Sequence, residues 1–479
     1  MDAIKQKVNC LITLGESLKA VPNAVRWVTK NTAILIVHGI GDQVPLATLD
    51  DFSRGLIQEY KTTFPDRMLL SHELMPKSSG IDKWFDNVLR IKNSESDFVV
   101  DIYEYYWANY TEDKASWTDL DKWINGVVKG ASNFYHQGEN SDLGIRYGDD
   151  SFFFTKKTKD SPRKFNAFRY KLFLGFFGRL VMMVSFLISG IISLITYIPF
   201  IGGLASSLAK SFGSTFLHDL VNVIGDISIY NVVDPKSKFY CVRKQIAEGA
   251  INALRYLIEK PADTKLLNKI EEDFQEGIID QDDYDKALLS MEHYYGSVIL
   301  AGHSLGSQIA YDSINKLNLL LNENEIAHYQ INSTRTEATS KLGNSGSIVN
   351  RFNGFITFGS PLDKIMFFLR EQIPKEQFIK QQILTHYHGF KQRPVGDYFQ
   401  CLNEGTYVKA ECGLIRLLDD MKWRNYYDKK DYVSGGLDYY HEVTNVDCNF
   451  QVTGKTAFTH SNYWADRYFF RDIINNFLT

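Results

Sequence analysis

The segment 294–317, YYGSVILAGHSLGSQIAYDSINKL, constrains the fold more than any other part of the chain. Residues 297–301 are apolar and partly β-branched, so they predict a short buried strand. The residues after Gly306 contain no helix breaker for two turns and predict a helix. Between strand and helix lies Gly-x-Ser-x-Gly, in which Gly302 and Gly306 leave space that side chains would fill. The pattern predicts a tight turn that holds Ser304 clear of a sheet.

Other segments extend this alternation of strands and helices. Four further strands are predicted, at 32–43 (ending in a glycine-rich loop), 97–110, 352–364 and 422–435. One helix is predicted at 50–64, with Asp50 or Asp51 as the cap, and another at 240–260. A helical hairpin that turns at Gly277 is predicted at 267–290, and a loop followed by a helix at 454–478. Strands that alternate with helices are typical of a mainly parallel sheet. We therefore predict an α/β fold.

The α/β core is expected to come from two parts of the chain. Residues 31–110 and 226–479 carry the alternation, whereas residues 111–225 interrupt it and are interpreted as one insertion. Residues 1–30 predict a peripheral helical extension. The 479 residues suffice for an α/β domain with an insertion of this size.

Composition excludes several classes of protein. The net charge is −4 with both signs interspersed, which gives no indication of nucleic-acid binding. Five scattered cysteines without a Cys-x-x-Cys pair suit a reducing compartment. The first residues lack the apolar core of a signal peptide, so an intracellular protein is expected. The acidic residues of the 267–290 hairpin lack the spacing of a calcium loop.

A serine hydroxyl becomes a useful nucleophile only when a base takes its proton and a third group orients that base. In one recurrent order, the chain supplies the serine, then an acid, then a histidine, each after a strand. His460 lies after the last predicted strand and before the final helix, so it is the predicted base. His441 comes too early in the chain for this position.

The predicted acid is Asp431, because it follows the strand that begins at residue 422 by a few residues. Asp363, which ends the preceding strand, is the alternative acid. Asp428 and Asp438 are weaker candidates. A loop aspartate is more often a turn former than a catalytic group, so only its position in the series favours Asp431.

Two backbone N–H groups are needed to stabilise the negative charge that develops on the substrate oxygen. Leu305, directly after the serine, is the first predicted donor. The second is Ile40 in the glycine-rich segment HGIG, with Gly41 as the alternative. This loop lacks the third glycine of a dinucleotide-binding turn and the lysine of a P-loop, so a phosphate site is a weak interpretation.

The motifs HGIG, GHSLGS, FGSPLD, DYVSG and HSNYW occur in the order found in lipases and esterases of the α/β-hydrolase fold, which the chain resembles. VHGIGDQ and GHSLGSQIAYD are most similar to intracellular phospholipases of the DDHD type and their bacterial relatives. The resemblance lies within residues 32–110 and 226–479 and does not reach the 111–225 insertion. The acid loop has Asp-Tyr-Val where relatives often have Asp-Pro-Val. The resemblance implies an α/β-hydrolase fold and the hydrolysis of a carboxylic ester of a lipid. It also implies that the reaction needs no metal or organic cofactor.

Other functions remain open at this level. A thioesterase or amide hydrolase would use the same residues. A hydrolase fold without activity, kept as a scaffold at a membrane, is a second class, although an intact set of serine, acid and histidine argues against it. A channel-like or structural membrane protein is a third class, and the large remainder of the chain argues against it.

The insertion contains 30 residues without a charge, from Leu180 to Ala209. Such a run is long enough to enter a bilayer. Basic residues flank it, which suits an anionic cytoplasmic leaflet: Lys156, Lys157, Lys159, Arg163, Lys164, Arg169, Lys171, Arg179 and Lys210. A single crossing would separate two strands that must join one sheet. Residues 172–215 are therefore expected to form a re-entrant or interfacial hairpin on the cytoplasmic face of a membrane, or else an apolar lid over the site of a cytoplasmic protein.

Overall fold

The computed structural model describes thirteen stretches of the chain, and the account below is confined to them. They are residues 27–40, 44–74, 87–111, 166–172, 229–231, 237–323, 349–368, 390–392, 399–403, 406–409, 417–431, 433–450 and 459–479. Most of the predicted extension at 1–30 and of the insertion at 111–225 lies outside the described residues. The same holds for the apolar segment 172–215 except for Leu172.

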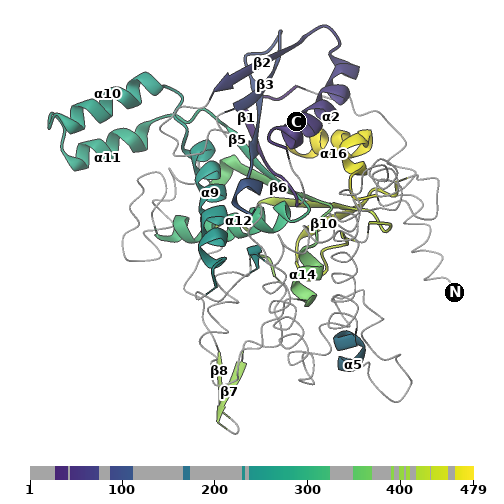
Figure 1. Ribbon diagram of the computed structural model, residues 1–479. Coiled ribbons are helices and arrows are strands. Elements are labelled where there is room, and N and C mark those ends of the chain that lie inside the picture. Colours follow the sequence, from purple (N-terminus) through teal and green to yellow (C-terminus); the bar gives the residue numbers. More distant parts are fainter. Residues whose placement is uncertain are drawn as a thin grey trace, which may run out of the picture.

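The described core is built on one eight-stranded sheet with the strand order β10-β9-β6-β5-β1-β4-β3-β2 (Figure 1). Its strands are β1 (Thr32–Val37), β2 (Met68–Leu74), β3 (Asn87–Asn93), β4 (Val99–Tyr105), β5 (Ser297–His303), β6 (Phe352–Phe358), β9 (Lys422–Tyr427) and β10 (Val443–Asp447). The six strands from β10 to β4 are parallel, and β3 and β2 continue the sheet in antiparallel pairing. The prediction of a mainly parallel α/β sheet is confirmed.

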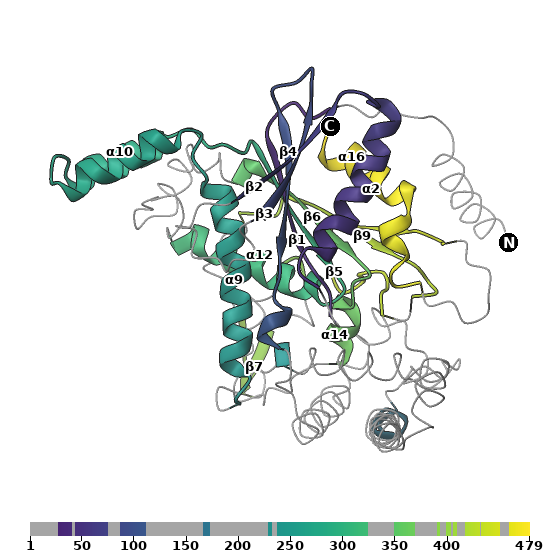
Figure 2. The ribbon, with the colours of Figure 1, turned by 45° about the horizontal axis from the view of Figure 1, so that its top comes forward.

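Helices cover both faces of this sheet (Figure 2). Helices α2 (Ala47–Thr63) and α16 (Arg467–Phe477) pack on one face, and α9 (Tyr240–Glu259) and α12 (Gly306–Glu323) pack on the other. Alternate residues of each central strand enter the two cores. In β1, Ile34 and Ile36 contact the α2 side, whereas Leu35 faces the α9 side. Because both faces are buried, these strands are continuous apolar runs in the sequence.

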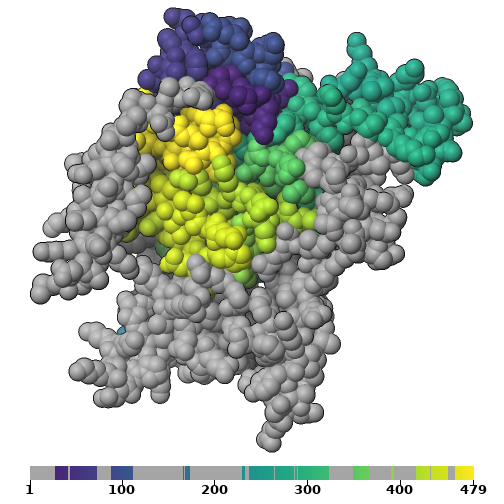
Figure 3. Space-filling model, turned by 180° about the vertical axis from the view of Figure 1, so that it is seen from behind, coloured from purple at the N-terminus to yellow at the C-terminus, as the bar shows by residue number. Residues whose placement is uncertain are grey.

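The hairpin predicted at 267–290 is present as α10 (Thr264–Gln275) and α11 (Gln281–Ser290). It turns at Gly277, whose φ of 70° lies in the left-handed region that favours glycine. The hairpin projects from the body of the molecule (Figures 1 and 3). The remaining described elements are η3 (Ala108–Tyr110), α5 (Ala167–Tyr170), α14 (Leu362–Phe368), η7 (Asn462–Ala465) and the two-stranded sheet of β7 (Phe399–Asn403) and β8 (Thr406–Lys409).

The predicted start of the helix at 50–64 is wrong. Helix α2 begins at Ala47, and its N-cap residue Leu46 has φ 71° and makes no side-chain capping bond. Asp50 and Asp51 instead lie within the first turns and pair with Arg54. The turn at Leu46 therefore depends on its tertiary setting, since no local capping residue determines it.

That setting includes Glu104, a buried carboxylate near the end of β4 with only 3% of its surface exposed. Backbone N–H groups at the start of α2 face it, but neither carboxylate oxygen has a hydrogen-bond partner of good geometry among the described residues. Burial raises the pKa of Glu104 to about 7, and the facing N–H groups offset only part of that rise. The native state therefore binds a proton more tightly at this site than the unfolded chain does.

This burial predicts how stability changes with pH. Between the ordinary glutamate pKa and about 7, the folded state holds more protons, so the free energy of unfolding falls as pH rises, by an amount on the order of 3 kcal/mol. Glu104→Gln removes the titrating group. We expect the variant to gain stability relative to the wild type between pH 5 and pH 8 in denaturant unfolding. Glu271→Gln, at an exposed position, is the control, and parallel pH curves for Glu104→Gln would contradict the prediction.

Candidate active site

Ser304 occupies a strained turn between β5 and α12. Its φ is 52°, in the left-handed region that non-glycine residues rarely adopt. A Cβ on Gly302 would lie 2.6 Å from the Cα of Ser307, and one on Gly306 would lie 2.3 Å from the carbonyl oxygen of Val37. Both glycines are therefore required by close backbone approach, as the sequence predicts.

The hydroxyl of Ser304 is buried and makes no hydrogen bond to the described residues. Only 1% of the residue is exposed, and Oγ has no hydrogen-bond partner among the described residues. The backbone is held firmly, because the Ser304 N–H donates to the carbonyl oxygen of Phe358 at 3.1 Å. A buried hydroxyl without a partner is rare in a purely structural setting, since it loses the hydrogen bonds of water without replacement.

His460 and Asp431 form a hydrogen-bonded pair. The Nδ1–H of His460 donates to Oδ2 of Asp431 at 2.9 Å, and the backbone N–H of Val433 donates to Oδ1 at 2.9 Å. Asp431 is 2% exposed. Burial by itself would raise the pKa of Asp431, but the hydrogen bond and charge of His460, with the N–H of Val433, hold that pKa well below its usual range. Asp431 is therefore an ionised carboxylate that fixes the orientation of the His460 ring through Nδ1.

The pair lies against the turn that carries Ser304. The His460 ring packs on His303, the residue before the serine, with ring centroids 4.8 Å apart. The Nε2–H of His303 donates to the carbonyl oxygen of His460 at 3.3 Å. At Gly359, with φ 60°, a Cβ would lie 2.9 Å from Cε1 of His460. Since Gly359 follows Phe358, whose carbonyl binds Ser304, the end of β6 supports both the serine and the histidine.

Two other histidines at the site have structural roles. Burial lowers the pKa of His38 to about 3, and it lowers the pKa of His303 to about 3 together with the nearby charge of His460. His38 Nε2 accepts the backbone N–H of Trp107 at 2.9 Å, so its proton lies on Nδ1, which donates to the Gly39 carbonyl. The indole N–H of Trp107 donates to the His38 carbonyl at 2.9 Å. These bonds fix the HGIG segment beside the serine.

The alternative acids are engaged elsewhere. Asp363 accepts the backbone N–H groups of Asp438 and Tyr439, at 2.7 and 3.2 Å, and so ties α14 to the loop before β10. Asp428 likewise accepts the N–H groups of Lys430 and Phe450, both at 2.6 Å.

His441, the other candidate base, has Glu442 as its nearest recorded charged neighbour, with Nδ1 3.7 Å from the carboxylate. Its backbone N–H donates to the Lys391 carbonyl at 2.8 Å. The described contacts bring together His460 and Asp431, and they do not bring His441 or Asp363 into this pair.

One predicted backbone donor, Leu305, lies at the serine turn, and the other, Ile40, lies on the facing loop after β1. Leu305 is fully buried directly after Ser304, and no hydrogen bond of its N–H is recorded among the described residues. On the facing loop, a Cβ on Gly39 would lie 2.8 Å from the Cβ of Ser304, so glycine lets the HGIG segment approach the serine. Ile40 follows and is partly buried against the core on the α9 side. The HGIG segment and the residue after Ser304 therefore lie close together, which is the placement that the predicted pair of donors requires.

Sequence reasoning did not identify Tyr463 as part of the site. Its hydroxyl donates to Oδ2 of Asp431 at 3.0 Å, the same oxygen that binds His460. The signal was present, because Tyr463 belongs to the HSNYW motif three residues after His460. Nothing in that spacing reveals a contact with a residue 32 positions earlier.

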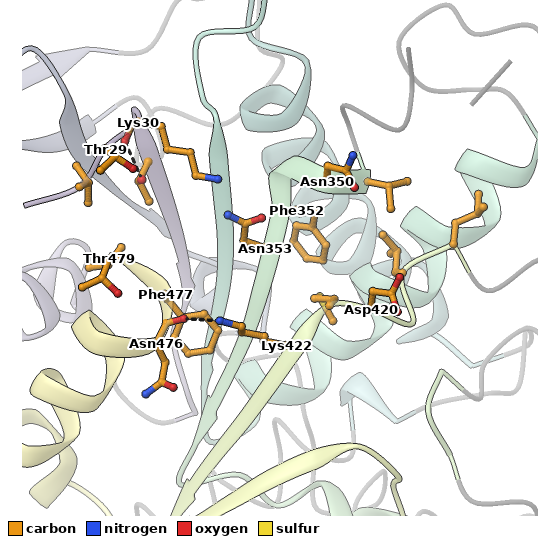
Figure 4. Close-up of a pocket in the computed structure, with 17 residues that line it drawn as sticks. Thr29, Lys30, Asn350, Phe352, Asn353, Asp420, Lys422, Asn476, Phe477 and Thr479 are labelled. Atoms are coloured by element: carbon orange, nitrogen blue, oxygen red, sulfur yellow. Dashed lines mark hydrogen bonds between the residues drawn. The ribbon is translucent and has the colours of Figure 1, made fainter. Parts of the chain in front are cut away.

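A cavity of about 330 Å³ lies at the other end of the sheet (Figure 4). Its lining includes Thr32, Phe352 and Lys422, the first residues of β1, β6 and β9. Ser304 and Asp431 follow the opposite ends of β5 and β9, so this cavity is not part of the candidate active site.

Within the described residues, no cluster of three or more histidine, cysteine or carboxylate side chains is arranged to hold a metal ion. No helix in the part of the chain that the structure describes is long and apolar enough to cross a membrane. Comparisons of the chain with protein-family models, with curated proteins and with solved structures gave no match.

Proposed function

We propose that this chain is a serine hydrolase of the α/β-hydrolase fold that cleaves a carboxylic ester through an acyl-enzyme on Ser304. The observation that carries the proposal is the strained Ser304 turn packed against the His460–Asp431 pair. Backbone strain of this kind costs on the order of 1–3 kcal/mol and persists at functional sites. Glycine would adopt this φ without strain, so the turn carries a serine side chain at an energetic cost.

The residues divide the reaction between them. His460 Nε2 takes the hydroxyl proton while Ser304 Oγ attacks the ester carbonyl carbon, and the N–H groups of Leu305 and Ile40 stabilise the resulting oxyanion. The imidazolium then gives its proton to the alkoxide as the C–O bond breaks, and an alcohol leaves. Water, deprotonated by His460, releases the carboxylic acid and restores the serine. Asp431 stays ionised and stabilises the imidazolium throughout.

A lipid ester is the proposed substrate class. The support for this choice is the resemblance of VHGIGDQ and GHSLGSQIAYD to intracellular phospholipases, together with the uncharged run from Leu180 to Ala209 in the insertion. An apolar segment joined to the core would give long acyl chains a surface to contact, whether at a membrane or as a lid.

Covalent labelling tests the proposal directly. The full chain is incubated with a fluorophosphonate, digested, and mapped by mass spectrometry. We expect one adduct, on the peptide that carries Ser304, formed only by the folded protein, and we expect an ester substrate to slow its formation. A panel of phospholipids, triglycerides and acyl thioesters then defines the substrate. The absence of an adduct on the folded chain, or an adduct only at another serine, would overturn the proposal.

A further inference from the structure

We propose that Tyr463 is a positioning residue that fixes the orientation of Asp431, the acid that binds His460, and lowers the basicity of that carboxylate. This inference rests on the proposed function and deepens it. Two residues of the HSNYW motif bind the same oxygen, Oδ2 of Asp431. His460 binds it through Nδ1 at 2.9 Å and Tyr463 through its hydroxyl at 3.0 Å.

The direction of the tyrosine hydrogen bond follows from its surroundings. Tyr463 is completely buried. Burial and the neighbouring charge of Asp431 raise the pKa of Tyr463 far above its ordinary value, so the hydroxyl stays protonated. A carboxylate can only accept, so the Tyr463 O–H donates to Asp431. The Ser434 hydroxyl lies 3.1 Å from the Tyr463 oxygen, and its side chain also contributes to the lowered pKa of Asp431. Tyr463 and Ser434 therefore both act on the carboxylate that binds His460.

The ring of Tyr463 is fixed independently of its hydroxyl. It packs against Phe450 at a centroid distance of 5.0 Å, Phe358 at 6.0 Å and Phe469 at 6.3 Å. These neighbours come from the loop after β10, from β6 and from α16. Removing the hydroxyl alone should therefore leave the position of η7, and of the main chain around His460, unchanged.

The shared oxygen has an electrostatic consequence. Each donor withdraws negative charge density from Oδ2, so a second donor weakens the attraction that Asp431 exerts on a protonated His460. Tyr463 thereby favours neutral His460, the form that acts as a base. Without its hydroxyl, the same oxygen would hold the imidazolium more strongly and oppose the loss of its proton.

Other ionisable groups near the pair do not supply this effect. Around His460 and Tyr463 the ionisable groups are Asp431 after β9, His303 on the serine turn and Cys448 after β10. Asp428, Asp447, Asp466 and Asp472 act on Cys448. Burial lowers the pKa of His303 to about 3, so this ring is neutral. Burial raises the pKa of the Cys448 thiol, so it too is neutral.

The test is the pH dependence of fluorophosphonate labelling for the wild type and Tyr463→Phe. Labelling reports the protonation state of the base without requiring a known substrate. We expect the rising limb of the labelling rate to shift to higher pH by about 0.5–1 unit, because the lost hydrogen bond to the charged Asp431 is equivalent to about 1–2 units and reaches His460 only in part. With an ester substrate, kcat should fall several-fold near neutral pH while KM stays unchanged. Tyr468→Phe, at a residue 62% exposed on α16, is the matched control.

Ser434→Ala provides a second variant. It removes a hydroxyl that lies beside both Tyr463 and Asp431, so it weakens hydrogen-bond donation to the carboxylate and should shift the limb in the same direction as Tyr463→Phe, by a smaller amount. Coincident pH profiles for wild type and Tyr463→Phe, with labelling at Ser304 intact, would overturn the role of Tyr463 alone. No labelling of the wild type at Ser304 would instead overturn the proposed function.

Discussion

Replacing Ser304 by alanine is expected to lower kcat for ester hydrolysis by on the order of 10⁴- to 10⁶-fold and to abolish fluorophosphonate labelling. The reason is that the acyl-enzyme cannot form without Oγ, while the remaining groups of the site still bind and orient the ester. The measurement is turnover of a chromogenic short-chain ester by purified full-length chain. Undiminished activity in Ser304→Ala would show that another group is the nucleophile.

Ser304→Gly separates loss of chemistry from loss of structure. Glycine adopts the φ of 52° found here without strain, so relief of about 1–2 kcal/mol offsets the greater chain entropy of glycine when unfolded. We expect this variant to be inactive yet no less stable than the wild type in denaturant unfolding. Ser313→Ala, a serine of α12 that bonds to the Ile309 carbonyl, is the control that should keep activity.

The central part of the sheet could be predicted from the sequence, and its edges could not. Strands β1, β5 and β6 are buried on both faces, so their apolar runs are unambiguous. At one edge, β2 exposes Leu69 and Leu70 by more than half of their surface, and at the other, β10 has no fully buried residue. Such strands are determined by pairing with their neighbours, and their side-chain pattern does not identify them.

The same distinction applies to the site. The order of serine, acid and histidine along the chain was enough to propose Asp431 and His460, because parallel strands end at one edge of a sheet. The choice between Asp431 and Asp363 depends on which loop folds toward His460, and the contacts of Tyr463 and His303 depend on how distant loops pack. A linear pattern does not contain that information. Those interactions arise only from the tertiary structure.

Removal of the histidine or its acid is the second large effect expected. His460→Ala loses the group that moves the proton, and Asp431→Asn loses the charge that stabilises the imidazolium and selects its tautomer. Each should lower kcat by on the order of 10⁴-fold. Because the two residues act as one unit, the double variant should be little worse than either single variant, which a double-mutant cycle measures.

Matched variants at the competing positions decide whether this pair is the catalytic one. Asp363→Asn keeps one acceptor for the N–H groups of Asp438 and Tyr439 and should change activity little. His441→Ala should also be mild, since the recorded contacts of His441 are to Glu442 and Lys391. A collapse of turnover in Asp363→Asn with near-normal turnover in Asp431→Asn would assign the acid to Asp363. The 2.9 Å bond between His460 and Asp431 leads us to expect the reverse.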